Sequence, residues 1–231
     1  MRIFIARHGQ VLPTGQANCA FDTSRDDPAL TPLGEKQADL LGEEMRRSGF
    51  QGKIIASPFS RTLNTAAHVA RALGLSFLID PRFREIVQQE EGLKDFAGKT
   101  LRQMKALFPE IAQESLPYPW WTIHKNTMEE IIDRVRPLIE ECLSQEEDCL
   151  LIGHGASTQA ALRILLNGKK AEDMGEICRG DNLNCSLSEF SVENGAILPV
   201  RIQDHAHLPV SLFTSNQRPV EERNGKICIV M

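Results

Sequence analysis

Two short histidine-containing segments carry most of the chemistry that this sequence suggests. Arg7-His8-Gly9 follows the first apolar run of the chain, and Gly153-His154-Gly155 follows a later one. Arg61 lies in a third polar segment, Ser57-Pro58-Phe59-Ser60-Arg61-Thr62, which also follows a short apolar run. Arginine binds phosphate oxygens through its planar fork of N–H donors, and a neutral imidazole is a good nucleophile near pH 7. These residue types together predict a site for a phosphoryl group.

A phosphoryl-transfer site also needs a proton donor for the leaving group. Glu85 lies in Phe83-Arg84-Glu85-Ile86, just after a further predicted strand, where its carboxyl group could supply that proton. Helices predicted to begin after residues 60 and 155 would add backbone N–H donors and a favourable dipole for an anion. Glycines beside each histidine would let the backbone approach a ligand closely.

Alternating strand and helix patterns are expected to position these side chains. We predict strands at residues 2–6, 53–56, 75–79 and 149–152, and a hairpin of 186–192 and 196–202 around the turn Asn194-Gly195. Helices are predicted from Thr31-Pro32 to near Gly49, from about 60 to 72, at 99–107, at 127–144 with Pro137 kinking or interrupting it, and after 155. This alternation predicts an α/β fold with a mostly parallel sheet, whose carboxyl edge binds the ligand.

Composition limits the class of protein. The chain has 231 residues, of which 42% are hydrophobic and 25% charged, typical of a soluble globular protein. The net charge of −5 gives no reason to expect nucleic acid as a partner. We find no apolar run of about 18 residues and no signal peptide, and six cysteines show no regular spacing. We therefore expect a cytoplasmic protein with reduced thiols.

The motifs resemble the histidine phosphatase superfamily, the phosphoglycerate mutase-like proteins. Arg7-His8-Gly9-Gln10 is similar to the Arg-His-Gly signature of that family, and other segments match it in the expected order. They are Leu30-Thr31-Pro32-Leu33-Gly34, Ser57-Pro58 with Arg61-Thr62, Arg84-Glu85, and Gly153-His154-Gly155. The resemblance spans residues 1–166 and extends to the hairpin near 186–202. It implies a three-layer α/β/α sandwich formed by residues 1–231 as one domain, with a lid or insert at about 92–126.

The resemblance also implies a role for each residue. His8 would be the nucleophile and form a phosphohistidine, while Arg7, Arg61, His154 and Gly155 would hold the phosphoryl group. Glu85 would protonate the leaving group and then activate water. The possible substrate-binding residues are Gln10, Thr14 and Asn18; the family has a small polar residue a few positions beyond the nucleophile, and Thr14 and Asn18 are both candidates. No metal or organic cofactor is expected.

The sequence favours a phosphatase and leaves two alternatives open. Phosphoglycerate mutases of the family carry Glu-Arg-X-Tyr-Gly after the acid, whereas this chain continues Glu85-Ile86-Val87-Gln88. A phosphoglycerate mutase is therefore the alternative enzyme, and a non-catalytic protein that binds a phosphorylated ligand is the second alternative. The expected partner is a small phosphorylated substrate or a phosphoprotein. The region at 92–126, with Trp120 and Trp121 packing in the core or the lid, would select it.

The last four residues have two interpretations. Cys228-Ile229-Val230-Met231 fits a prenylation motif, which would be the one route to a membrane. Residues 226–230 equally fit a terminal β-strand. The oligomeric state is not predicted.

Overall fold

A six-stranded sheet forms the centre of the structure. The computed structural model describes residues 1–11, 27–85, 96–122, 126–215, 220–223 and 225–229. Strands β3, β2, β4 and β1 run parallel, and β5 and β6 continue the sheet in antiparallel pairing, in the order β3-β2-β4-β1-β5-β6. Their bounds are β1 Arg2–Arg7, β2 Lys53–Ala56, β3 Phe77–Ile79, β4 Cys149–Gly153, β5 Leu187–Glu193 and β6 Ala196–Asp204. The mostly parallel sheet and its edge hairpin are thus confirmed.

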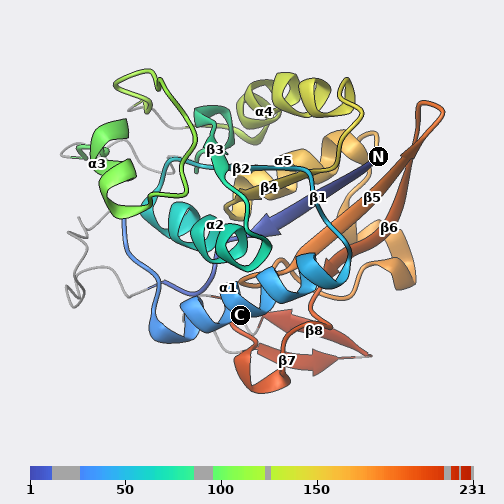
Figure 1. The fold of residues 1–231 in the computed structure, drawn as a ribbon. Helices are drawn as coiled ribbons and strands as arrows, with labels where there is room; N and C mark the ends of the chain where they lie inside the picture. The colour runs from blue at the N-terminus through green and yellow to red at the C-terminus, as the bar shows by residue number, and fades with distance from the viewer. Residues whose placement is uncertain (12–26, 86–95, 123–125, 216–219, 224, 230–231) are drawn as a thin grey trace.

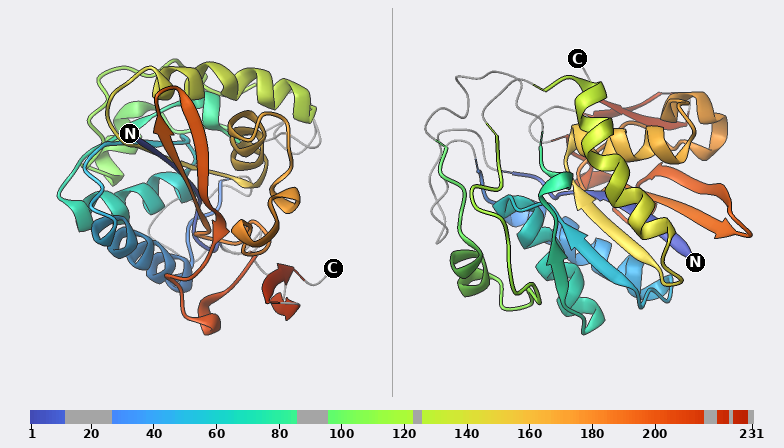
Figure 2. Two further views of the ribbon diagram at one scale, coloured as in Figure 1. Left: turned by 90° about the vertical axis from the view of Figure 1, so that its right-hand side faces the viewer. Right: turned by 90° about the horizontal axis from the view of Figure 1, so that it is seen from above.

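Helices cover both faces of this sheet, which gives the three layers (Figure 1). Helices α1 and α2 pack on one face, while α4 and α5 pack on the other. The α-helices are α1 Pro32–Arg47, α2 Ser60–Leu73, α3 Leu101–Leu107, α4 Met128–Leu143 and α5 Gly155–Leu165. Short 3-10 helices lie at η1 Pro81–Phe83, η3 Ala171–Ile177 and η4 Val210–Leu212. A separate hairpin of β7 Val220–Arg223 and β8 Lys226–Ile229 lies apart from the main sheet (Figure 2).

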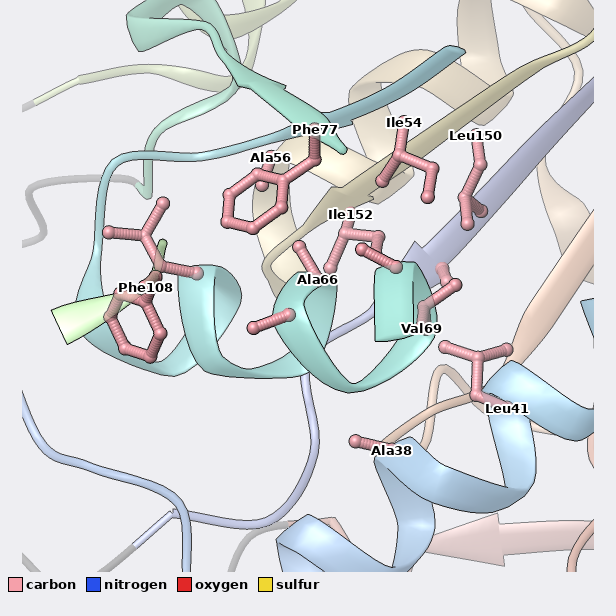
Figure 3. Packing of buried hydrophobic residues seen from close by; sticks show 14 of the residues in the cluster. Ala38, Leu41, Ile54, Ala56, Ala66, Val69, Phe77, Phe108, Leu150 and Ile152 are labelled. Carbon is pink, nitrogen blue, oxygen red and sulfur yellow. The ribbon is translucent and has the colours of Figure 1, made fainter. Parts of the chain in front are cut away.

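The central strands are apolar on both faces because both faces are covered. In β1, Phe4 and Ala6 join the hydrophobic cluster beneath α1 and α2, whereas Ile3 and Ile5 join the cluster beneath α4 and α5. Figure 3 shows the first cluster, in which Leu41 of α1 lies beside Val69 of α2, and side chains of β2 and β4 face α2. These two cores fix the sheet that carries the polar strand ends.

Helix ends follow the local signals in the sequence. Thr31 caps α1 by accepting a hydrogen bond from the Gly34 N–H, and Gly74 ends α2 in the left-handed region with φ 67°. The interruption predicted at Pro137 is wrong, because α4 is continuous from Met128 to Leu143. Pro137 lies on the exposed side of α4, where water can satisfy the carbonyl group that the missing N–H leaves without a partner.

The segment at 96–122 packs against α2 through aromatic rings. Trp120 is buried at 4% exposure, and its ring lies edge-on to Phe59 with centroids 5.2 Å apart. Its Nε1–H donates to the Lys99 carbonyl over 2.9 Å. The prediction that Trp120 packs in the core is confirmed.

In the described part of the chain, none of the helices combines the length and the apolar character that crossing a membrane would require. The strand interpretation of the C-terminal region is confirmed for β8. Val230 and Met231 lie outside the described residues.

The packing of α1 predicts a large loss of stability on truncation. Leu41 is fully buried between α1 and α2, so Leu41→Ala leaves a cavity that the rigid helix pair cannot refill. We expect the free energy of unfolding to fall by about 2–5 kcal/mol. Leu198→Ala is the matched control, because Leu198 is 51% exposed on β6, and its effect should stay within about 0.5 kcal/mol. Urea unfolding of both variants measures this, and equal losses would contradict the assigned core.

His207 predicts a pH dependence of stability. Its two ring nitrogens are buried and accept or donate no hydrogen bond among the described residues, and burial lowers its pKa to about 4. The unfolded chain therefore binds a proton there below pH 6.5 that the folded chain does not, so stability is lost as the pH falls from 6.5 towards 4. We expect His207→Met to reduce the loss between pH 7.5 and 4.5 by about 2–3 kcal/mol. Unfolding curves at both pH values measure it; an unchanged loss would exclude this source.

Candidate active site

The two predicted histidines meet at the carboxyl edge of the sheet. Strands β1 and β4 are parallel neighbours, with Arg7 opposite Gly153, although the chain between them is long. The His8 N–H donates to the Gly153 carbonyl over 3.0 Å, which fixes the first residue beyond β1 against the last residue of β4. As a result the rings of His8 and His154 lie with centroids 5.3 Å apart.

The surroundings of His8 leave one ring nitrogen ready for chemistry. Nδ1 lies 2.7 Å from the Gly9 carbonyl oxygen, which can only accept, so Nδ1 carries the proton and Nε2 holds a lone pair. Burial lowers the pKa of His8 well below its usual value of 6.5, and the nearby Arg61 and Arg7 lower it further. The imidazole is therefore neutral near pH 7, as a nucleophile must be.

His154 is held between a serine and an arginine. The Nε–H of Arg61 donates to its Nδ1 over 3.1 Å, so the ring proton lies on Nε2, which donates to Ser57 Oγ over 2.7 Å. Burial lowers the pKa of His154 well below 6.5, and Arg61 adds to this. In this structure neutral His154 orients Arg61 through Nδ1, and that nitrogen would have to gain a proton before it could donate to a phosphoryl oxygen.

Arg61 is a buried cation with an unused donor. Its guanidinium lies over the ring of Phe59, 4.6 Å from the centroid, and is only 7% exposed. Its Nη1 makes no hydrogen bond among the described residues and lies 3.9 Å from Asp27 Oδ1. Burial lowers the pKa of Arg61. A buried N–H without an acceptor is rare in proteins, and an anion entering the site would satisfy it.

Arg7 reaches the same site from β1. Its Nη1 donates to the Asn182 carbonyl and lies 3.4 Å from Ser215 Oγ. Its charge lowers the pKa values of both His8 and His154, after burial and the charge of Arg61. The two predicted arginines therefore approach the histidine pair from different elements.

Asp27 occupies the start of α2, which corrects one expectation. Its Oδ1 accepts from the Ser60 N–H over 2.7 Å and its Oδ2 from Ser60 Oγ over 2.6 Å, while Lys99 Nζ lies 3.2 Å away. The backbone donor at residue 60 is thus already used by a carboxylate. By contrast, the space where a Cβ of Gly155 would lie, at the start of α5, is open.

Two of the three glycines beside the histidines are needed for packing within the protein, whereas the predicted role was close approach of a ligand. A Cβ on Gly9 would lie 2.4 Å from the Gly34 carbonyl oxygen, and one on Gly153 would lie 2.4 Å from the Phe83 ring. Both are therefore required by packing within the protein. Only the third, Gly155, has the open surroundings that a ligand would need.

Glu85 joins the cluster from the other side. It follows η1, is 25% exposed, and its Oε2 lies 3.7 Å from His154 Nδ1. The structure thus brings together all five predicted catalytic residues, namely Arg7, His8, Arg61, Glu85 and His154.

The predicted substrate-binding residues are placed less directly. The side-chain oxygen of Gln10 accepts from Thr31 Oγ1 over 2.7 Å, which ties the loop after β1 to the start of α1. Thr14 and Asn18 lie outside the described residues. In the described residues, His, Cys, Asp and Glu side chains do not gather in groups of three that could hold a metal ion.

Asn184 and Thr214, from the C-terminal part of the chain, support the backbone of the nucleophile, and no sequence motif marks them. Asn184 Nδ2 donates to the His8 carbonyl over 3.0 Å, and its Oδ1 accepts from Thr214 Oγ1 over 3.1 Å. Gln37 of α1 donates to Thr214 Oγ1 and to the Leu212 carbonyl. Arg134 of α4 was also missed, although its spacing from Ile131 and Val135 on the buried side of the helix is an available signal.

Comparison with known proteins adds relatives of two activities. A putative phosphoserine phosphatase 2 of Hydrogenobacter thermophilus is 30% identical over 193 residues, covering 83% of this chain and 90% of that protein. A probable phosphoglycerate mutase GpmB of Yersinia enterocolitica is 27% identical over 228 residues, covering 94% of this chain and 100% of that protein.

Solved structures share the fold. A mycobacterial glucosyl-3-phosphoglycerate phosphatase in complex with inorganic phosphate has a TM-score of 0.59 at 23% identity, covering 90% of this chain and 99% of that one. Bacillus stearothermophilus YhfR has a TM-score of 0.60 at 20% identity, covering 89% and 98%. The model of the histidine phosphatase superfamily (branch 1) matches residues 3–205. The chain therefore belongs to the histidine phosphatase superfamily, as its sequence motifs had indicated by their resemblance to those of the family.

Proposed function

We propose that this protein is a phosphatase that hydrolyses a phosphate monoester through a phosphohistidine on His8. The observation that carries the proposal is the neutral His8 ring, whose Nδ1–H is held by the Gly9 carbonyl while Arg7 and Arg61 flank the site. This leaves the Nε2 lone pair as the nucleophile beside two phosphate-binding cations.

The first step transfers the phosphoryl group to the enzyme. His8 Nε2 attacks phosphorus, the bond from phosphorus to the ester oxygen breaks, and its electron pair stays on that oxygen. Glu85, beside His154, donates a proton to the leaving oxygen. The N–H groups of Arg7 and Arg61 stabilise the charge on the equatorial oxygens, because those guanidinium groups are already fixed by Asn182 and Phe59.

The second step releases phosphate. Glu85 takes a proton from water, the water oxygen attacks phosphorus, and the N–P bond breaks with its electron pair returning to His8 Nε2. Before the substrate binds, neutral His154 orients Arg61 by accepting its Nε–H at Nδ1. The arriving phosphate dianion raises the proton affinity of His154, so Nδ1 takes a proton from solvent and donates it to a phosphoryl oxygen beside Gly155 at the start of α5. The Arg61 Nε–H that Nδ1 releases then donates to the phosphoryl group as well.

Small phosphorylated metabolites are the proposed substrates. The relatives named above carry the names of phosphoserine, phosphoglycerate and glucosyl-3-phosphoglycerate. We propose further that residues 1–231 act as one domain and that the region at 92–126 borders the leaving group. In the described part of this region, the Trp120 ring contacts the Phe59 ring. The centroid of the Phe59 ring lies 5.2 Å in turn from that of His154. Five described cysteines are free thiols, which supports a cytoplasmic location.

Phosphoglycerate mutase is the second candidate. The names of several relatives favour it, whereas the stretch Glu85-Ile86-Val87-Gln88, without the Arg-X-Tyr-Gly that mutases of the family carry, favours hydrolysis. The complete set of His8, His154, Arg7 and Arg61 argues against a protein that only binds a phosphorylated ligand.

Replacement of the nucleophile tests the mechanism. Wild-type protein is expected to hydrolyse p-nitrophenyl phosphate in EDTA and to form an acid-labile, base-stable phosphoenzyme, because His8 attacks without help from a metal ion. His8→Ala should lose at least about 1,000-fold in kcat and should not be labelled. His68→Ala is the control, since His68 of α2 pairs with Asp39 of α1 and makes none of the contacts described for the site. Activity or labelling that survives in His8→Ala would overturn the mechanism.

The fate of 3-phosphoglycerate separates the two enzymes. With this substrate a phosphatase releases inorganic phosphate in proportion to the substrate consumed, because water reaches the phosphohistidine. A mutase returns the phosphoryl group to a hydroxyl, so it forms 2-phosphoglycerate, faster with a bisphosphoglycerate primer and with little free phosphate. Phosphorus NMR follows both products. We expect phosphate release to exceed isomerisation at least about tenfold, and the reverse ratio would establish the mutase.

A further inference from the structure

We propose that Arg134 is a positioning residue for Glu85. From α4 its guanidinium group holds the turn at 81–85, at the end of which the proposed proton donor stands. The inference rests on the proposed function, because it concerns the leaving-group step of that reaction.

The contacts of Arg134 lie at both ends of this turn. Its Nη1 donates to the Pro81 carbonyl over 3.4 Å, and its Nη2 donates to the Arg84 carbonyl over 3.2 Å. Pro81 is the first residue of η1, and Arg84 directly precedes Glu85. One planar group on a helix therefore fixes the start of the turn and the peptide group that leads into Glu85.

Holding the Arg134 guanidinium group at this position costs free energy, because burial removes the charged group from water. Burial lowers its pKa to about 9, the charge of Arg84 adds to this, and the charge of Glu85 acts in the opposite direction. Among the described residues no carboxylate oxygen lies within 4.0 Å of its guanidinium nitrogens, so backbone carbonyls take the place of an ion-pair partner. A half-buried cation that bonds only carbonyl groups is unfavourable for stability, and such groups gather at functional sites.

Arg84 holds the same turn from the opposite side. Its Nη1 donates to the Pro81 carbonyl over 3.1 Å, and its Nη2 donates to Thr122 Oγ1 over 3.0 Å. The Pro81 carbonyl thus receives two guanidinium groups, whereas among the described residues Arg134 alone has a side chain that bonds the Arg84 carbonyl next to Glu85. Without Arg134 the peptide group between Arg84 and Glu85 would lose this hydrogen bond, and the Glu85 side chain would no longer be held in one direction.

A misplaced acid affects substrates according to their leaving group. When the bond to the ester oxygen breaks, an alkoxide needs the proton from Glu85, whereas p-nitrophenolate is stable enough to leave without it. A general loss of positive charge would weaken phosphate binding for both kinds of ester alike. The ratio of kcat/KM values for the two kinds therefore reports the position of the acid, since kcat/KM covers the steps up to departure of the leaving group.

The experiment measures kcat/KM for p-nitrophenyl phosphate and butyl phosphate in five variants of the full chain, four single and one double. For Arg134→Met we expect a fall of about 10–100-fold with butyl phosphate and of no more than about threefold with p-nitrophenyl phosphate. Arg134→Lys keeps the charge but reaches only one carbonyl, so it should shift the ratio in the same direction by less. Arg136→Met is the matched control, because Arg136 is exposed on the same helix, and it should leave both values unchanged.

Glu85→Gln connects the inference to the reaction. Glu85→Gln should lower kcat/KM for butyl phosphate relative to p-nitrophenyl phosphate more than Arg134→Met does. The double variant of Glu85→Gln and Arg134→Met should have the same ratio as Glu85→Gln alone. If Glu85→Gln shifts the ratio and Arg134→Met lowers both substrates equally, the positioning role is wrong while the proposed function stands. If Glu85→Gln leaves the ratio unchanged, Glu85 is not the proton donor, and both its role in the reaction and the inference about Arg134 are overturned, while the phosphohistidine on His8 is tested separately by His8→Ala. If Arg134→Met does not fold, Arg134→Lys decides, and a wild-type ratio in that variant overturns the inference.

Discussion

The site depends on holding two guanidinium groups and two imidazoles in one buried space. Four nitrogen-rich groups repel one another there, and the repulsion is reduced by keeping both histidines neutral. A carbonyl and an aromatic ring hold the two cations, since Arg7 donates to the Asn182 carbonyl and Arg61 lies over the Phe59 ring. The charges of Glu85 and Asp27 act on Arg61 against the effect of burial, which lowers its pKa. The protein thus keeps two fixed cations beside the histidine pair.

The sheet makes this arrangement possible. Strands β1 and β4 lie side by side in the middle of the sheet, and hydrophobic clusters on both faces prevent either strand from moving. Because parallel strands end at the same edge, residues 8 and 154 lie side by side there, with ring centroids 5.3 Å apart. The rigid strand β1 supplies Arg7, and the residues directly after β1 and β4 supply His8 and His154. Helix α2 supplies Arg61, and the turn after η1 supplies Glu85.

The sequence predicted those parts of the site that follow strands directly. Apolar runs that end in His8 and His154 give strand ends, and strand ends of one parallel sheet must meet. Contacts between distant loops have no such pattern: Asp27 with Lys99 depends on how two irregular segments pack, and nothing periodic in the chain marks it. The role of Gly9 was also beyond the sequence, because a glycine beside a histidine fits ligand approach and close backbone packing equally well.

The relay from Thr214 through Asn184 to the His8 carbonyl has a consequence for comparing members of this family. The family model ends at residue 205, so one end of the relay lies in a part of the chain that motif comparison does not weigh. Two homologues with the same histidines and arginines can therefore differ in the hydrogen bonds that hold the backbone of the nucleophile. Substitutions in this C-terminal segment can then change the reaction rate while every signature residue stays the same.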